Sequence, residues 1–186
     1  RRASVLVFDE RGTGNGWLLP AGPLREPLPT QADASRLVLY NAPKASTPLP
    51  GFLGRPRLAG AVALQNWWSG SEAPSMEALQ ALAAADSRST RRIFAAAGVA
   101  RPERFFSMLQ ALGLTFERLP LQDHHPFTPG KPLPWPADTT DVLVTEKDAV
   151  KLRPEAAGGV RVWVVALDFH PEPAFDDALR SLFPPH

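Results

Sequence analysis

The sequence predicts an α/β protein whose strands pair largely in parallel. Short apolar or β-branched segments bounded by turn residues are typical of strands, and segments with helical spacing stand between several of them. Strands that alternate with helices favour parallel pairing, because each helix carries the chain back to the start of the next strand. The two-residue alternation of a half-exposed strand is weak here, which indicates strands covered on both faces.

The expected strands and helices follow one another along the whole chain. The strand segments are Ser4 to Phe8, Arg36 to Tyr40, Leu58 to Leu64, Ile93 to Ala97, Thr115 to Leu119, Asp141 to Thr145 and Val160 to Ala166. The helical segments are Met76 to Ala83, Phe105 to Leu112 behind Pro102, a helix that starts at Thr145, and Pro173 to Leu182. The run Thr145-Glu146-Lys147-Asp148 has the form of a capping box, which places a helix start at Thr145.

Prolines and glycines cluster between residues 41 and 57, where they are expected to break any regular structure and to mark a boundary. The predicted division is 1–42 for the end of a first domain that is mostly missing, 43–56 for a linker, and 57–186 for a C-terminal α/β domain. The first residue is arginine rather than methionine, and an apolar strand follows almost at once. We therefore expect a fragment that begins inside a domain.

Composition excludes several classes of protein. The chain has 186 residues, of which 44% are hydrophobic and 21% charged, as in an ordinary globular domain. The absence of cysteine excludes a disulfide scaffold, a cysteine-liganded metal site and thiol catalysis. The 20 cations and 19 anions give a net charge of +1, so no nucleic-acid partner is expected. No apolar run approaches the ~18 residues of a membrane span and no signal peptide opens the chain, which indicates an intracellular protein.

Phosphate-binding loops are not found in the sequence. The glycine-rich stretch Gly12 to Gly16 follows a strand but runs into Trp17-Leu18-Leu19-Pro20, which cannot open a helix, so it is predicted to be a structural turn. The motif G-x-x-x-x-G-K-[ST] does not occur. If the protein uses a nucleoside triphosphate, the loop that holds its phosphates is expected upstream of this chain.

Two loops carry residues suited to phosphate chemistry. Arg25-Glu26-Pro27 holds a cation and a carboxylate side by side, able to bind a phosphate and to reach the shell of a Mg²⁺ ion, or simply to form a local ion pair. Asp123-His124-His125 places a carboxylate beside two imidazoles, where the Asp can orient a His that carries a proton. The alternative is a pair of exposed loop histidines.

Lys147 and Lys151 are one helical turn apart and would share a helix face next to a helix N-terminus. This arrangement favours an anion site, and the alternative is a solvated face paired with Asp148. An arginine cluster is suited either to acidic lipid headgroups or to an ordinary solvated surface. The cluster comprises Arg88, Arg91, Arg92, Arg101 and Arg104.

Four motifs occur in an order that is specific to one family. They are GNGWLLPAGPLREP at residues 14–27, AGVARPERFF at 97–106, DHHPF at 123–127 and TEKDAVK at 145–151. In sequence and in order they resemble the second half of the bacterial tetraacyldisaccharide 4′-kinase family, which acts in the lipid A pathway. The resemblance covers most of the chain and corresponds to the C-terminal portion only.

The resemblance implies a P-loop-type N-terminal domain and a smaller C-terminal α/β domain joined by a two-strand hinge. It implies phosphorylation of the 4′-hydroxyl of tetraacyldisaccharide 1-phosphate, the lipid A disaccharide precursor, with ATP and Mg²⁺ as cofactors. It also implies a peripheral protein at the cytoplasmic face of the bacterial inner membrane, monomeric when complete. The family's phosphate loop, catalytic Asp and metal motif would all precede this chain, so the chain alone is expected to be inactive.

Motif positions carry roles over to single residues. Glu26 corresponds to the family's carboxylate near Mg²⁺, and Arg25 to a phosphate or substrate contact. His124, with Asp123 beside it, corresponds to the histidine that pairs with the family's catalytic Asp. The TEKDAVK segment is structural or anion-binding by the same resemblance.

Two functions of other classes stay open from the residues alone. One is a non-catalytic module that binds an anionic sugar or phosphate through Lys147, Lys151 and Arg25. The other is a degenerate remnant with a structural role. A phosphate loop encoded immediately upstream would favour the kinase over both of them.

Overall fold

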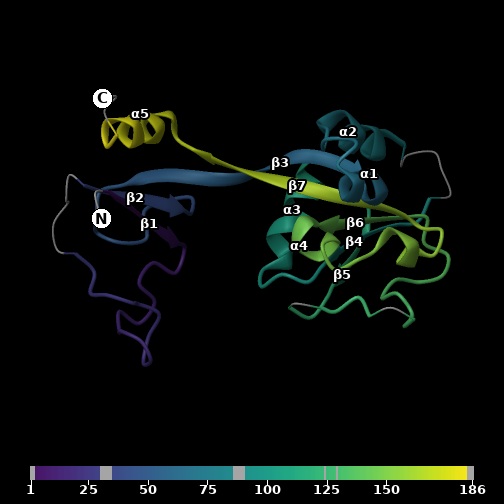
Figure 1. Ribbon diagram of the computed structural model, residues 1–186, viewed down its shortest axis with the longest axis horizontal. Helices are drawn as coiled ribbons and strands as arrows, with labels where there is room; N and C mark the ends of the chain where they lie inside the picture. The colour runs from purple at the N-terminus through teal and green to yellow at the C-terminus, as the bar shows by residue number, and fades with distance from the viewer. Residues whose placement is uncertain (1–2, 30–34, 86–90, 124, 129, 184–186) are drawn as a thin grey trace. The chain divides into compact units, whose positions relative to one another are not determined.

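A computed structural model describes residues 3–29, 35–85, 91–123, 125–128 and 130–183 (Figure 1). The chain forms two compact units, one of Arg1–Arg57 with Phe169–His186 and the other of Leu58–Asp168. The chain passes between the units only within the strands β3 and β7, whose bounds are given below. Two strands thus connect the units, as the family resemblance implies.

The first unit is built on three parallel strands in the order β1-β2-β3, followed late in the chain by helix α5. These elements are β1 Ser4–Asp9, β2 Arg36–Asn41, β3 Phe52–Ala63 and α5 Pro173–Ser181. Its core comprises the buried residues Phe8, Val38, Tyr40, Ala42 and Leu49. The Tyr40 hydroxyl donates to the backbone oxygen of Leu49 over 2.7 Å, so the one buried phenol is satisfied where it packs.

The second unit is an α/β layer structure in which β7, β6, β4 and β5 lie next to one another in that order and pair in parallel. Its further strands are β4 Ile93–Ala97, β5 Glu117–Pro120, β6 Asp141–Thr145 and β7 Arg161–Pro171. Its helices are α1 Leu64–Ser69, α2 Met76–Ala85, α3 Pro102–Ala111, α4 Glu146–Ala149 and the 3₁₀ helix η2 Pro154–Ala157. The α/β class with parallel pairing, predicted from the sequence, is confirmed.

Apolar layers cover both faces of this sheet. Every residue of β4 and β6 is buried. Ala95 and Ala97 belong to one hydrophobic cluster, whereas Phe94 and Ala96 belong to another. Successive side chains of a strand point to opposite faces, so the two clusters lie on opposite sides of the sheet. This double burial explains why no two-residue alternation is visible in the sequence.

The structure corrects the expectation that residues 41–57 lack regular structure. Strand β3 begins at Phe52 and continues through Pro56. Its register with β2 ends at the pair of Asn41 with Gly54, so Pro56 lies beyond that ladder and its missing N–H removes no bond to β2. The predicted domain ranges stay a prediction, although the compact units group 43–56, and the residues after Asp168, with the first unit.

Two helices differ from the sequence prediction. Helix α1 was not predicted; it ends where Gly70 adopts a left-handed φ of 65°. Within this helix, Trp68 donates from Nε1 to Leu152 O over 2.9 Å, and the Arg153 guanidinium lies 4.4 Å from the centre of the Trp68 ring. Helix α4 is capped by Thr145, as predicted, but ends at Ala149. Among the described residues, no helix has the length and apolar composition needed to cross a membrane.

Candidate functional site

The motifs of the second unit meet at one edge of its sheet. Gly98 directly follows β4, the segment from Leu121 follows β5, and Thr145 ends β6. Because these strands are parallel, their carboxyl ends lie at the same edge, which is where open α/β sheets bind ligands. The backbone N–H of Leu121 donates to Ala97 O over 3.0 Å, which extends the β4–β5 ladder into the loop.

Gly98 is the point where these segments come closest together. A Cβ added there would lie 2.8 Å from Oδ1 of Asp148, 3.0 Å from the backbone oxygen of Gln122 and 3.4 Å from Cβ of His125. The first two distances are shorter than ordinary carbon–oxygen contacts. A side chain at this position would push the segments apart, so their packing depends on glycine.

The carboxylate of Asp148 joins two of these segments. The side chain is fully buried, and its Oδ2 accepts a hydrogen bond from Gly98 N over 2.9 Å and another from Thr145 Oγ1 over 2.7 Å. Thr145 Oγ1 in turn accepts from Asp148 N over 3.3 Å, which is the N-cap bond of α4. The loop after β4 is therefore held against the start of α4 by one buried side chain.

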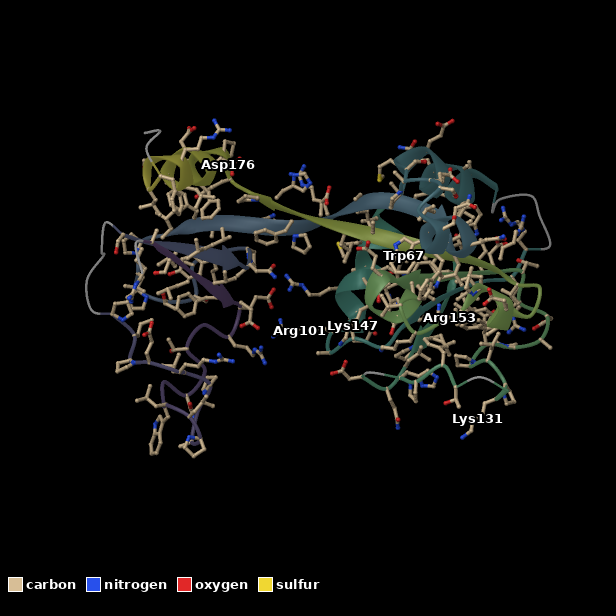
Figure 2. The ribbon with its side chains drawn as sticks, viewed as in Figure 1. Trp67, Arg101, Lys131, Lys147, Arg153 and Asp176 are labelled. Atoms are coloured by element: carbon tan, nitrogen blue, oxygen red, sulfur yellow. The ribbon has the colours of Figure 1, made fainter. Side chains whose placement is uncertain are left out.

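Asp123 forms an ion pair with a lysine of α4. Lys147, labelled in Figure 2, donates from Nζ to Oδ1 of Asp123 over 2.9 Å. Both side chains are roughly half exposed, at 42% for Lys147 and 47% for Asp123. The His125 N–H donates to Gln122 O over 2.9 Å and closes a turn that contains Asp123. His124, the histidine to which the resemblance assigns proton chemistry, lies outside the described residues.

The two lysines of the TEKDAVK segment do not share a helix face, because α4 ends at Ala149 before Lys151 is reached. Lys147 pairs with Asp123, whereas Lys151 Nζ is buried and lies 3.7 Å from Oδ1 of Asp148. Each lysine is thus engaged with a different carboxylate. Their role as contacts for a phosphate or substrate stays a prediction.

His125 has a packing role. Its ring stands edge-on to that of Phe127, with 5.0 Å between centroids. It also lines a cavity of about 430 Å³ together with Lys131 and Leu152. The ring of His125 thus packs against an aromatic side chain and its Cβ borders Gly98, so this residue contributes to local packing.

Arg25 and Glu26 belong to the first unit. Both line a cavity of about 530 Å³ beside the residues Leu6 to Phe8 of β1. The Glu26 side chain is 66% exposed, and its Oε1 lies 3.9 Å from the guanidinium of Arg36, a pair too exposed and too long to hold it firmly. An exposed carboxylate fits one ligand position of a Mg²⁺ ion, which prefers oxygen ligands. Among the described residues no group of three acidic or histidine side chains could hold a metal ion.

The glycine-rich stretch is a structural turn, as predicted. Gly12, Gly14 and Gly16 have φ values of 57°, 59° and 74°, and their N–H groups close three successive turns onto Asp9, Arg11 and Thr13. Over the described residues 17–29 the stretch leads into turns and bends and not into a helix. Arg11 donates from its backbone N–H to Oδ1 of Asp9 and from Nε to Oδ2 of Asp9, each over 2.8 Å. The carboxylate of Asp9 therefore binds a residue of the same turn.

A second buried carboxylate lies at the opposite end of β6. Asp141 is fully buried, and Arg91 donates to its two oxygens over 2.8 and 3.0 Å. Arg161 and Trp163 each donate a further bond of 3.0 Å. Burial raises the pKa of Asp141, but the hydrogen bonds from Arg91 and Trp163 lower it more, so that the pKa lies below that of an ordinary aspartate.

This amino edge also accounts for part of the predicted arginine cluster. Arg92 binds Glu117 and Asp138 over 2.7 and 2.6 Å, and its guanidinium lies 5.1 Å from the centre of the Phe94 ring. Arg91 and Arg92 are therefore engaged in ion pairs within the second unit. Arg88 lies outside the described residues.

Comparisons with known proteins identify the family. The family model described as Tetraacyldisaccharide-1-P 4′-kinase, LpxK, matches residues 1–184. A tetraacyldisaccharide 4′-kinase of Methylibium petroleiphilum is 52% identical over all of this chain and 50% of its own length. One from Leptothrix cholodnii is 49% identical over 98% of this chain and 51% of its own length.

A solved structure agrees at the level of the fold. The chain is similar to LpxK from Aquifex aeolicus, described as an "apo" form in complex with ATP, with a TM-score of 0.62 and 20% identity. The similarity covers 99% of this chain and 53% of that one. The chain thus spans about half the length of the curated relatives it matches.

The parallel sheet defines an α/β protein, and the relatives that the chain matches are named as kinases. The chain belongs to the tetraacyldisaccharide 4′-kinase family, as the motif order in the sequence implies. The sequence did not single out Gly98, Asp141 or Asp148 as key residues. The capping-box pattern and a glycine directly after a buried strand were the available signals for two of them.

Proposed function

We propose that this chain is the C-terminal part of a kinase that transfers the γ-phosphate of ATP to the 4′-hydroxyl of tetraacyldisaccharide 1-phosphate in lipid A biosynthesis. The observation that carries the proposal is the family match over residues 1–184, supported by relatives about half identical to this chain. The loop geometry agrees with it, because the Asp123 turn lies at the sheet edge where α/β proteins bind their ligands.

The chain's own residues would serve proton transfer and positioning. The attacking 4′-hydroxyl loses its proton during transfer, and an imidazole at His124 is suited to accept or share it. Asp123, which pairs with Lys147, precedes that histidine in the chain, and a carboxylate is suited to orient an imidazole that carries a proton. Arg25 is suited to bind a phosphate through its planar guanidinium.

Mg²⁺ and ATP are the cofactors that this function requires. When bound, Mg²⁺ would supply positive charge that neutralises the charge developing during phosphoryl transfer. Glu26 is the residue we assign to its shell, as one exposed carboxylate among ligands that phosphates and water provide. The sequence contains no phosphate loop, so we further propose that the isolated chain does not hydrolyse ATP.

The substrate determines the location. A disaccharide with four acyl chains is held in a bilayer by the hydrophobic effect, whereas ATP is in the cytoplasm. We therefore propose that the complete protein acts as a monomer, peripherally, at the cytoplasmic face of the inner membrane. The net charge of +1 gives no general attraction for nucleic acid.

The test uses the full-length protein that contains this chain. It is incubated with γ-labelled ATP, Mg²⁺ and tetraacyldisaccharide 1-phosphate in mixed micelles, and label in the lipid is counted. We expect transfer that requires both Mg²⁺ and the lipid, and none with the 186-residue chain alone. ATP consumption without label in the lipid would refute the kinase assignment, and transfer by the chain alone would refute the assignment of the ATP site to another segment.

A further inference from the structure

We propose that Asp148 is a positioning residue that holds the Asp123 turn in place through Gly98. This role rests on the proposed function insofar as it concerns catalysis, since Asp123 and the histidine after it matter only if the protein is a kinase. The structural part, that Asp148 fixes the turn, concerns only the second unit and can be tested separately.

Burying the carboxylate of Asp148 costs free energy that its partners offset poorly. Asp148 is fully buried, yet only Oδ2 is hydrogen-bonded, while Oδ1 is buried without a hydrogen-bond partner. Its charge is balanced by Lys151, whose Nζ is 3.7 Å away and is itself buried without a hydrogen bond. An ion pair with such loose geometry offsets its desolvation poorly, and apolar residues of similar size would give a more stable core. Stability alone therefore does not explain the pair.

Asp148 also reaches the turn through Gly98. Its Oδ2 accepts from Gly98 N over 2.9 Å, which fixes the backbone directly after β4. Gly98 in turn packs against the turn, because a Cβ added at Gly98 would lie 3.0 Å from Gln122 O and 3.4 Å from the Cβ of His125. Those two residues are joined by the hydrogen bond that closes the turn of Asp123. A shift of the carboxylate is thus passed to the turn by direct contact.

The same helical turn also holds Asp123 itself. Lys147 precedes Asp148 in α4 and binds Asp123 over 2.9 Å. Thr145 Oγ1 donates a hydrogen bond to Oδ2 of Asp148, which fixes the start of α4 and with it the position of Lys147. Asp148 therefore controls both the backbone of the turn, through Gly98, and its charged side chain, through α4.

Asp141 provides a matched control. It is also a fully buried carboxylate on β6 with arginine partners, but it lies at the amino end of the strand, away from the carboxyl-edge loops. Asp148→Ala removes a buried carboxylate from α4, directly after β6, and Asp141→Ala removes one from the start of β6. A general loss of stability would affect both variants alike, whereas loss of positioning would affect only the first.

The structural readout is amide hydrogen exchange in the wild-type chain and both variants, followed by mass spectrometry. We expect Asp148→Ala to raise exchange about tenfold or more at the amides of Leu121 and His125, which are hydrogen-bonded in the wild type. Asp141→Ala should leave them protected under conditions where both variants are folded. Unchanged exchange in Asp148→Ala, or an equal rise in both variants, would overturn the proposal.

The catalytic readout is steady-state kinetics of the full-length protein with the same substitutions. We expect Asp148→Ala to lower kcat about tenfold or more with little change in the KM for ATP, and Asp141→Ala to keep wild-type kcat. The double variant Asp148→Asn/Lys151→Met retains an oxygen that can accept from Gly98 without the ion pair, so it should recover most of the rate.

If Asp148→Ala does not fold, the double variant and Asp148→Asn decide: wild-type exchange in Asp148→Asn combined with a lost rate would contradict positioning. A wild-type protein without activity would refute the proposed function, while the exchange experiment would still decide whether Asp148 holds the turn.

Discussion

Lys147 and Asp123 form an ion pair of 2.9 Å that joins helix α4 to the loop after β5. The pair lies at the carboxyl edge of the parallel sheet, next to the histidine to which the family resemblance assigns proton chemistry. Because both partners are roughly half exposed, solvent weakens their attraction. The ion pair is therefore expected to affect the position of Asp123 more than the stability of the fold.

Replacing Lys147 tests this division between position and stability. In the full-length protein, Lys147→Met should cost less than ~1 kcal/mol of unfolding free energy, as is usual for exposed ion pairs. It should nevertheless lower kcat several-fold, because Asp123 loses its anchor. Urea unfolding and steady-state kinetics measure the two effects. Lys44→Met, at an exposed lysine of the first unit, is the control and should change neither quantity.

The two histidines of the DHHPF motif are expected to differ. His124→Ala should lower kcat at least tenfold with little change in thermal midpoint, within the ~10²–10⁴-fold range of a general base. His125→Ala should lower the thermal midpoint instead, because its ring packs on Phe127 and its Cβ borders Gly98. Kinetics and calorimetry on both variants provide the comparison. A normal kcat in His124→Ala would remove this residue from the mechanism.

Asp141 is expected to make the stability depend on pH. Its pKa is lowered in the folded state, so its stabilisation is complete above the unfolded pKa of ~3.9 and is lost as pH falls through the folded pKa. At pH 7, Asp141→Ala should cost about 3 kcal/mol, the lower end for breaking a buried ion pair, since Arg161 stays exposed to water. Chemical unfolding between pH 7 and pH ~2 would show the difference from wild type shrinking below pH ~4. A difference independent of pH would contradict this account, and Glu155→Gln is the surface control.

Gly98 is expected to tolerate no side chain. Gly98→Ala would place a Cβ 2.8 Å from Asp148 Oδ1 and 3.0 Å from Gln122 O, and overpacking of this kind costs about 1–3 kcal/mol. In an Asp148→Ala background one of these clashes disappears, so the added cost should be smaller. A double-mutant cycle by urea unfolding measures the coupling. Additive effects would show that the two residues do not press on each other.

Glu26 is expected to act through the metal. Glu26→Gln in the full-length protein keeps the size of the side chain but removes its charge, so the Mg²⁺ concentration for half-maximal rate should rise. Its only close ion pair among the described side chains is the 3.9 Å contact with Arg36, so little stability should be lost. Rate as a function of Mg²⁺ is the measurement. Wild-type rate with wild-type Mg²⁺ dependence would make Glu26 structural.

Local patterns in the sequence predicted most of the elements. The strands Ile93–Ala97 and Asp141–Thr145 were predicted within their observed bounds because uninterrupted apolar runs leave few alternatives. The N-cap at Thr145 was predicted from a local pattern as well. The second half of β3 was predicted as a strand from Leu58, but its first half from Phe52 was missed because Pro56 normally excludes a strand.

The candidate site was predictable only in part. Asp123 and Lys147 were named from their own loops, but nothing in the sequence says that they form a pair, since 24 positions separate them. The prediction that Lys147 and Lys151 share a helix face was wrong because α4 ends at Ala149. Sequence periodicity alone does not show where this helix ends. The buried position of Asp148 depends on Gly98, a contact made by the parallel register of β4 and β6.

We propose that the protein containing this chain phosphorylates the 4′-hydroxyl of tetraacyldisaccharide 1-phosphate. The most direct measurement is the position of new phosphate in the product formed by the full-length protein from ATP and tetraacyldisaccharide 1-phosphate, read by ³¹P NMR and mass spectrometry. The account predicts one added phosphate at the 4′-oxygen and loss of this product in His124→Ala. An unmodified lipid, or phosphate added at another oxygen, would contradict it.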